Sequence, residues 1–183
     1  MKYPMSDFKK IIATEAEIKQ IISRTAHEIS EHYAGKKLLL CGILKGAFIF
    51  MSDLVRHLTI PAELTFIKAS SYGGGACSLG EVKVAEFSDI ASYGGFDILV
   101  IDDILDTGHT LCNLKEFLKT KGFTSVEFCT LLDKPERRES SIFVKFIGKK
   151  IENDFVVGYG LDYGEKYRDL PFIAALDDKI YSE

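Results

Sequence analysis

The fold is decided by one stretch, Ile98-Leu99-Val100-Ile101-Asp102-Asp103-Ile104-Leu105-Asp106-Thr107-Gly108-His109-Thr110-Leu111. Its first four residues are apolar strand formers, a run typical of a strand that is buried on both faces in a parallel sheet. Asp102 and Asp103 follow where this strand is expected to emerge at its carboxyl end. Ligands of open α/β sheets bind at that end of the strands, so we expect a ligand site here.

The turn that follows has the composition of a phosphate site. Residues Asp106 to Thr110 supply backbone N–H groups, two threonine hydroxyls and one glycine, immediately before a helix predicted over Leu111–Leu118. A helix N-terminus attracts anions, and the carboxylates upstream suit ribose hydroxyls or a magnesium shell. The predicted ligand is therefore a sugar phosphate. Its expected contacts are Asp102, Asp103, Asp106, Thr107, Gly108, His109 and Thr110.

A purely structural role for these carboxylates is the alternative. Asp102 and Asp103 would then end the strand, and Asp106 or Thr107 would cap the helix. Capping needs only one such residue, whereas three carboxylates within five positions repel one another unless a cation or a polyhydroxyl ligand compensates them. The sequence therefore favours a ligand site.

Composition indicates one soluble domain that spans residues 1–183. The chain has 183 residues, 46% of them hydrophobic and 27% charged, which is ordinary for a globular protein with a sizeable core. A formal net charge of -4, with no basic run longer than a pair, argues against a nucleic-acid partner. The four cysteines lack zinc-ligand spacing, and no run suits a signal peptide or a membrane span. We therefore expect no membrane association and a cytoplasmic location.

Hydrophobic periodicity predicts strands that alternate with helices, the pattern of a parallel, doubly wound α/β sheet. Helices are expected over Glu15–Tyr33 and Ala47–Leu58, in addition to the one over Leu111–Leu118. Further strands are expected over Lys37–Leu44, Leu64–Ser70, Glu81–Phe87, Ser125–Leu132, Ile142–Ile147 and Phe155–Leu161. A glycine-rich loop, residues 71–80, should be mobile.

Two further motifs carry chemistry. Leu44-Lys45-Gly46 follows the first core strand and precedes a helix, so its backbone amides and its lysine can hold a diphosphate. Near the end of the chain, Phe155 offers an aromatic face, Asp162 a carboxylate and Arg168 a guanidinium. These three groups suit a planar base, a metal or its water, and a phosphate.

Together these motifs resemble those of the type I phosphoribosyltransferases, which use phosphoribosyl diphosphate (PRPP), and in particular the branch that acts on the 6-oxopurines hypoxanthine and guanine. The resemblance covers nearly the whole chain, from the first helix to Arg168. It implies a type I phosphoribosyltransferase fold: a central, mostly parallel sheet flanked by helices, a small hood subdomain from the terminal segments, and a flexible flap loop at about residues 70–86.

The resemblance also implies how PRPP is held. Leu44, Lys45 and Gly46 would form the pyrophosphate loop, whose first peptide bond is often cis in that family, and Arg168 would contact the diphosphate. Ser71 and Tyr72 in the flap would close over the reacting carbon and exclude water, which would otherwise hydrolyse PRPP.

The acidic residues receive separate roles from the same resemblance. Asp102 and Asp103 would hold the ribose hydroxyls directly or through hydrated Mg²⁺, and Asp162 would serve a magnesium shell. Asp106 would be the general base, or the acid in the reverse direction. His109 would contribute a backbone amide to the phosphate site rather than act as an acid.

The purine-binding residues are also assigned by the resemblance. Lys134 would donate to the exocyclic oxygen of the base and reject a 6-amino group, because an amine cannot accept that hydrogen bond. Phe155 would stack on the purine, and the backbone of Val156 would meet its edge. The reaction implied is transfer of the phosphoribosyl group from PRPP to N9 of hypoxanthine, and of guanine, in the presence of Mg²⁺. Relatives of this kind form homodimers or homotetramers.

Three alternatives remain from the sequence. A xanthine-preferring relative would share the PRPP site and differ only around the base. An RNA-binding regulator built on the same scaffold is disfavoured by the acidic composition and by the full set of Lys134, Phe155, Asp162 and Arg168. A phosphorelay receiver domain also places acidic pairs at strand ends, but it would not explain the turn Asp106–Thr110 or the C-terminal motif.

Overall fold

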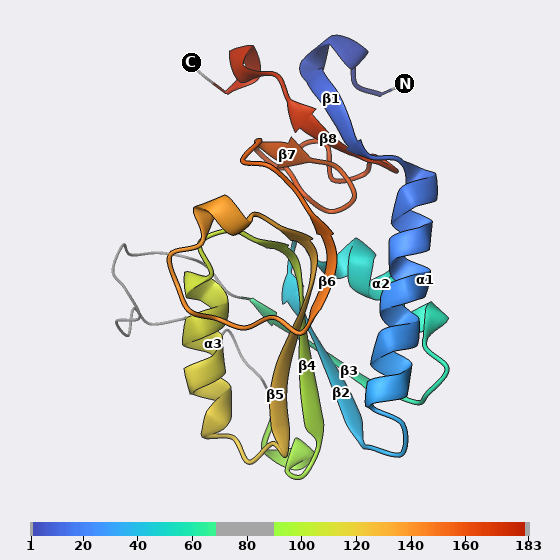
Figure 1. The fold of residues 1–183 in the computed structure, drawn as a ribbon, viewed down its shortest axis with the longest axis vertical. Coiled ribbons are helices and arrows are strands. Elements are labelled where there is room, and N and C mark those ends of the chain that lie inside the picture. Colours follow the sequence, from blue (N-terminus) through green and yellow to red (C-terminus); the bar gives the residue numbers. More distant parts are fainter. Residues whose placement is uncertain (1, 69–89, 182–183) are drawn as a thin grey trace.

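The computed structural model describes residues 2–68 and 90–181 (Figure 1). Ser71, Tyr72, the rest of the expected flap and the strand expected over Glu81–Phe87 lie outside the described residues. None of the helices among the described residues combines the length and the apolar character that crossing a membrane requires.

A five-stranded sheet forms the centre of the molecule (Figure 1). Its strands run parallel in the order β3-β2-β4-β5-β6. They are β2 (Leu38–Leu44), β3 (Glu63–Lys68), β4 (Asp97–Leu105), β5 (Ser125–Asp133) and β6 (Phe146–Lys150). The first six residues of β2 and of β4 are buried, as expected of strands covered on both faces. The predicted fold class, a parallel sheet flanked by helices, is confirmed.

Helices cover both faces of this sheet. They are α1 (Glu15–His32), α2 (Phe48–His57) and α3 (His109–Lys119), with short 3₁₀ helices at Met5–Asp7, Ile90–Tyr93, Pro135–Arg137 and Asp178–Ile180. In β2, Leu38 and Leu40 belong to the core that α1 and α2 complete. The intervening Leu39 and Cys41 belong to the core that α3 completes. This alternation follows from the two-residue period of a strand.

A second, antiparallel sheet lies beyond the carboxyl ends of the parallel strands (Figure 1). It has the order β1-β8-β7 and consists of β1 (Phe8–Ala13), β7 (Val156–Val157) and β8 (Ile173–Leu176). Its strands come from the two ends of the chain, where a small accessory unit was expected. Strands β1 and β8, both of which are short, were not predicted from the hydrophobic periodicity.

The strand predicted over Ile142–Ile147 is wrong for its first four residues, because β6 begins at Phe146. Ile142 and Val144 are buried, but their segment packs over the turn that precedes α3. There the Ser140 hydroxyl donates to the carbonyl oxygen of Thr107 at 3.2 Å. The apolar alternation reflects burial in the α3-side core rather than pairing in the sheet.

The strand predicted over Phe155–Leu161 is reduced to Val156–Val157. The three residues after it, Gly158, Tyr159 and Gly160, have φ angles of 101°, 51° and 103°. Positive φ angles are incompatible with an extended strand. The chain therefore turns here, which brings the following motif back over the ends of the parallel strands.

The N-terminus of α1 is closed by a capping box that the analysis of the sequence had not singled out. The Thr14 hydroxyl accepts from the amide of Glu17 at 3.3 Å, and the Glu17 carboxylate accepts from the amide of Thr14 at 2.8 Å. Two amides at the helix start are satisfied in this way. The cap fixes the point at which the chain passes from β1 into α1.

Replacing Thr14 by Ala should lower the free energy of unfolding by about 1 kcal/mol. For a chain of this length that corresponds to a fall of about 2–4 °C in the melting temperature. Thermal unfolding of wild type and variant measures it. Thr14→Ser keeps the hydroxyl and should retain most of the stability; an equal loss in both variants would contradict the role of the cap.

Candidate active site

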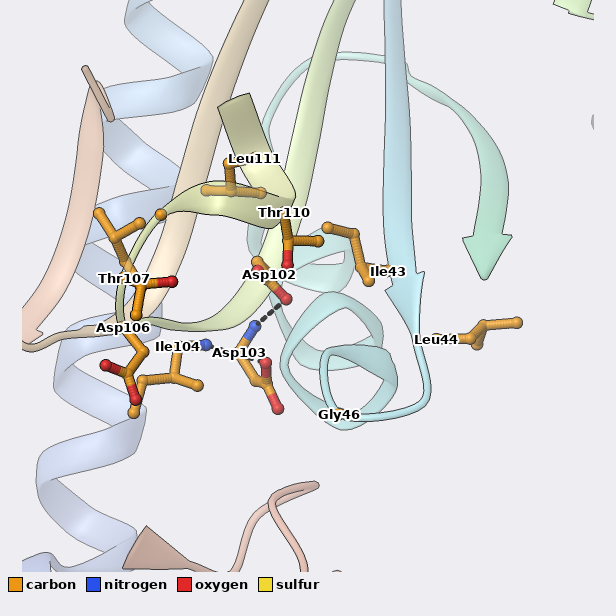
Figure 2. Close-up of a pocket in the computed structure, with 12 residues that line it drawn as sticks. Ile43, Leu44, Gly46, Asp102, Asp103, Ile104, Asp106, Thr107, Thr110 and Leu111 are labelled. Carbon is orange, nitrogen blue, oxygen red and sulfur yellow. Dashed lines mark hydrogen bonds between the residues drawn. The ribbon is translucent and has the colours of Figure 1, made fainter. Parts of the chain in front are cut away.

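A cavity of about 380 Å³ opens at the carboxyl ends of β2 and β4 (Figure 2). In Figure 2 the carboxylates of Asp102 and Asp103 lie between the loop after β2 on one side and the turn before α3, which carries Asp106, on the other. The cavity is lined by Ile43, Leu44, Gly46, Asp102, Asp103, Ile104, Leu105, Asp106, Thr107, Gly108, Thr110 and Leu111. The structure thus brings together the two motifs that the sequence predicted to hold the sugar phosphate.

Asp102 and Asp103 lie within strand β4 rather than in a loop beyond it, because β4 continues to Leu105. The amide of Asp103 donates to Asp102 Oδ1 at 3.0 Å, and the amide of Ile104 donates to Asp103 Oδ1 at 2.9 Å. Burial, followed by the charge of Asp103, raises the pKa of Asp102 well above its usual value. Burial also raises the pKa of Asp103. A cation or a polyhydroxyl ligand would favour the ionised forms of both.

Two glycines allow the loops of the site to approach the acidic pair. A Cβ atom on Gly46 would lie 1.7 Å from Asp103 Oδ2, and one on Gly160 would lie 2.1 Å from the carbonyl oxygen of Gly46. The backbone at Gly46 is therefore packed against the carboxylate of Asp103 on one side and against the backbone at Gly160 on the other. The peptide bond between Leu44 and Lys45, at the start of the loop that contains Gly46, is cis.

The turn before α3 is braced from outside the site. Gly108 caps α3 with φ at 85°, and the first amides of the helix have no partner within it. The carbonyl oxygen of Thr107 accepts from the amides of Glu139 and Ser140 at 3.1 and 3.2 Å. Arg138 Nε donates to the carbonyl oxygen of Asp106 at 3.2 Å. These contacts hold a loop whose amides can receive a phosphate.

His109 is the first residue of α3, two residues before the predicted helix start. Its Nε2 lies 2.8 Å from Glu139 Oε2, outside the set of residues that line the cavity. The side chain thus pairs with a surface carboxylate, while the backbone belongs to the turn that was predicted to bind phosphate. This arrangement supports the predicted backbone role of His109.

Asp106 is flanked by two basic side chains. Lys134 Nζ lies 3.9 Å from Asp106 Oδ2, and Arg137 Nε donates to Asp106 Oδ1 at 3.0 Å. The side chain of Lys134 is only 9% exposed, and burial lowers the pKa of its ammonium group. Lys134 is therefore a buried group beside the acidic turn rather than a solvated lysine at the end of a strand. Arg137 was not predicted to belong to the site, although it stands three residues after Lys134.

The cationic residues predicted to hold diphosphate are both engaged with carboxylates. Lys45 Nζ lies 3.0 Å from Glu165 Oε2. Arg168 Nη2 lies 2.8 Å from Asp162 Oδ1 and 3.3 Å from Glu165 Oε1, and its Nη1 donates to the carbonyl oxygen of Gly160 at 2.7 Å. Hydrogen bonds from Lys45 and Arg168 lower the pKa of Glu165. Glu165 was not predicted from the sequence to belong to the site.

Phe155 and Val156 lie at the small sheet, outside the lining of the cavity. Phe155 as a residue is 39% exposed, and its ring stacks on that of Tyr181, with ring centroids 4.9 Å apart. Its carbonyl oxygen accepts from the amide of Leu176 at 2.8 Å, while Val156 pairs with Ala175 in the sheet. An exposed aromatic ring at this position remains suited to stacking on a planar ligand.

The three predicted metal ligands do not form one cluster. Among the described residues, no group of three His, Cys, Asp or Glu side chains is arranged to hold a metal ion. Asp102 and Asp103 form one acidic pair, while Asp162 is paired with Arg168. Mg²⁺ commonly takes one or two carboxylates and completes its shell with water and substrate phosphates. The residues present fit that mode rather than a site made only of protein ligands.

Comparisons with known proteins agree with this geometry. Residues 10–164 match the family model of the phosphoribosyl transferase domain. A hypoxanthine-guanine phosphoribosyltransferase of Staphylococcus aureus is 44% identical over 178 residues, which cover 97% of this chain and 98% of that protein.

Solved structures are similar as well. The crystal structure of a hypoxanthine phosphoribosyltransferase from Staphylococcus aureus matches with a TM-score of 0.90 and 43% identity, covering 97% of this chain and 96% of the other. A hypoxanthine-guanine phosphoribosyltransferase from Bacillus anthracis matches with a TM-score of 0.86 and 37% identity, covering 93% of this chain and 99% of the other.

Replacing Gly160 by Ala should damage the site because the new Cβ meets the backbone of Gly46. The alanine would be overpacked and would also have to adopt an unfavourable positive φ angle. We therefore expect a loss of about 2–4 kcal/mol in the free energy of unfolding. Gly164→Ala is the matched control, since Gly164 also has a positive φ, at 57°, but open space around it, and should lose about 1 kcal/mol. Denaturant unfolding compares the two; equal losses would exclude the steric explanation.

Proposed function

The chain belongs to the phosphoribosyl transferase family, and on that premise we propose that it transfers the 5-phosphoribosyl group of PRPP to N9 of hypoxanthine and of guanine. The products are the corresponding purine nucleoside monophosphate and diphosphate. The protein is thus an enzyme of purine salvage. Its relatives with 44% identity over almost their full length carry the name of this activity.

The observation that carries the choice of base is the pair formed by Lys134 and Asp106. Their charged atoms lie 3.9 Å apart at the end of the sheet, one a donor and the other an acceptor. A 6-oxopurine presents O6 and N7 side by side on one edge. Lys134 can donate to O6 while Asp106 accepts a proton from N7. Adenine would place an amino group against the ammonium of Lys134, where it cannot accept.

In the proposed reaction, N9 of the base attacks C1′ of PRPP, and the bond between C1′ and the diphosphate oxygen breaks. The bonding electron pair leaves with diphosphate, and the N7 proton passes to the carboxylate of Asp106. Positive charge develops on the ribose ring in the transition state. The carboxylates at the end of β4 are placed to stabilise that charge.

The remaining residues of the cavity would position PRPP. Asp102 and Asp103 would accept from the ribose hydroxyls, and the turn from Asp106 to Thr110 would receive the 5-phosphate through its amides. Mg²⁺, held through Asp102, Asp103 or Asp162 and water, would neutralise the diphosphate as its charge grows. Because Asp102 is buried and Asp103 is partly buried, their interaction with the ribose would be weakly screened by solvent.

The diphosphate would lie between the loop after β2 and the C-terminal motif. The amides of Leu44 to Gly46, the ammonium of Lys45 and the guanidinium of Arg168 supply its donors. Phe155 would stack on the purine, and the backbone of Val156 would meet its edge. Ser71 and Tyr72 of the flap, at about residues 70–86, would close over the reacting carbon.

We further propose that residues 1–183 act as one phosphoribosyltransferase domain, with the small sheet as its hood. A homodimer or homotetramer is supported by the exposed apolar side chains of Phe48 in α2 and of Leu64 and Phe66 in β3, since such side chains favour protein contacts when they gather. A cytoplasmic location is supported by the buried thiols of Cys41 and Cys129, because reduced cysteines are usual there.

The function is tested by initial rates with PRPP and Mg²⁺ against hypoxanthine, guanine, xanthine and adenine in parallel. We expect nucleotide formation from hypoxanthine and guanine, and none from adenine. Turnover of xanthine alone would replace the proposal by a xanthine-preferring enzyme. Inactivity towards all four bases, with PRPP still bound, would contradict an enzymatic role.

Replacing Asp106 by Asn should lower kcat by about 10²- to 10⁴-fold, because it removes the proton acceptor but keeps the shape of the turn. The KM for PRPP should change much less. Steady-state kinetics with hypoxanthine measures both quantities. An equal loss in kcat and in PRPP affinity would contradict the assignment of Asp106 as the base.

Replacing Lys134 by Ala should weaken hypoxanthine binding by about 10- to 100-fold, the effect of losing one charged hydrogen bond. The preference for hypoxanthine over adenine should fall as well. Competition kinetics measures this preference, with Lys119→Ala on the exposed face of α3 as the control. Undiminished rejection of adenine by Lys134→Ala would show that another group reads the 6-position.

A further inference from the structure

We propose that the carboxylate of Glu165 takes the place of the substrate's diphosphate group in the diphosphate subsite when no substrate is bound. In the substrate-free protein its carboxylate forms ion pairs with Lys45 and Arg168. The diphosphate group of PRPP must displace this carboxylate in order to bind. This inference rests on the function proposed above and assigns a role to a residue that the proposed reaction does not use. Glu165 would thus set the affinity for PRPP and the ease with which diphosphate leaves.

The contacts of Glu165 connect both diphosphate ligands. Its Oε2 lies 3.0 Å from Lys45 Nζ, and its Oε1 lies 3.3 Å from Arg168 Nη2. One carboxylate therefore bridges two cations that come from positions far apart in the sequence. A diphosphate presents the same chemistry, with anionic oxygens that accept from several donors.

The backbone places Glu165 for this role. Tyr163 and Lys166 form an antiparallel bridge, and the two residues between them, Gly164 and Glu165, have φ angles of 57° and 65°. Positive φ at both central positions is typical of a tight type I′ turn. Glutamate is an uncommon residue in that conformation, and such departures gather at functional sites. The amide of Glu165 donates to Asp162 Oδ2 at 2.9 Å, which ties the turn to the site.

The side chain can leave without disturbing the core. It is 63% exposed, and that of Lys45 is 58% exposed, so the two can separate by rotation about side-chain bonds. Arg168 keeps its contacts with Asp162 and with the carbonyl oxygen of Gly160. The guanidinium therefore stays in place while one of its carboxylate partners is exchanged for a phosphate oxygen.

Displacement reduces the net gain from binding diphosphate. Two ion pairs must be broken before two new ones form, and the freed carboxylate then repels the incoming anion. Exposed ion pairs are individually weak, so removing the charge of Glu165 should tighten diphosphate binding by about threefold to tenfold. The KM for PRPP should fall by a similar factor, whereas kcat should stay unchanged or fall as product release slows.

The test is titration calorimetry of inorganic diphosphate with Mg²⁺ into wild type and Glu165→Gln, combined with the KM for PRPP. Glu116→Gln is the matched control, since Glu116 pairs with Lys119 on α3 and its side chain is 61% exposed. It makes the same change in net charge away from the site and should leave both quantities unchanged. Tighter diphosphate binding by Glu165→Gln alone is the expected result.

A second variant keeps the proposal falsifiable if Glu165→Gln folds poorly. Glu165→Asn also removes the charge, and asparagine tolerates a positive φ, so it should give the same tightening. Unchanged or weaker diphosphate binding in the folded variants would overturn the role of Glu165. Failure of the wild type to form nucleotide from PRPP and hypoxanthine would instead overturn the proposed function, so the two failures are distinguishable.

Discussion

The close approach of three segments of the chain at Gly46 is the constraint on which the site depends. Gly46 lies against the carboxylate of Asp103, and Gly160 lies against the carbonyl oxygen of Gly46. The parallel register of β2 and β4 sets the first of these contacts, and the left-handed turn after β7 sets the second. A side chain at Gly46 would push the loop after β2 away from the carboxylate of Asp103, and one at Gly160 would push the C-terminal motif away from that loop. Packing and the proposed chemistry therefore impose the same requirement.

The charges of the site are balanced in two different ways before any ligand binds. The cations Lys45 and Arg168 are paired with carboxylates of the C-terminal motif. Asp102 and Asp103 instead accept hydrogen bonds from backbone amides, and burial raises the pKa of both, which favours their neutral forms. Binding of PRPP with Mg²⁺ would exchange the first set of partners and add partners to the second. Substrate binding would therefore exchange existing ion-pair partners for new ones rather than supply a partner to an unpaired charge.

The fold was predictable where the sequence shows the apolar run of a strand buried on both faces or the period of an amphipathic helix. The expected and observed bounds of the strand ending at Leu44 and of the helix beginning at Glu15 agree to within one residue. The prediction failed over 142–145, where alternating apolar residues cover a turn instead of pairing in the sheet. Of the strand expected over Phe155–Leu161 only Val156–Val157 forms, because Gly158 and Gly160 adopt positive φ angles. Local patterns report burial, and they do not specify what covers the buried side chain.

The sequence by itself determined the motifs that resemble those of the family. They are the acidic pair at the end of a buried strand, the turn from Asp106 to Thr110, the loop from Leu44 to Gly46 and the C-terminal motif. Each is a run of neighbouring residues, so its chemistry can be recognised without coordinates. Only the tertiary structure decided that Lys134 lies beside Asp106, that Asp162 pairs with Arg168 apart from Asp102 and Asp103, and that Glu165 bridges two cations. Those relations join segments distant along the chain, and they depend on strand register and on turns whose geometry no local pattern encodes.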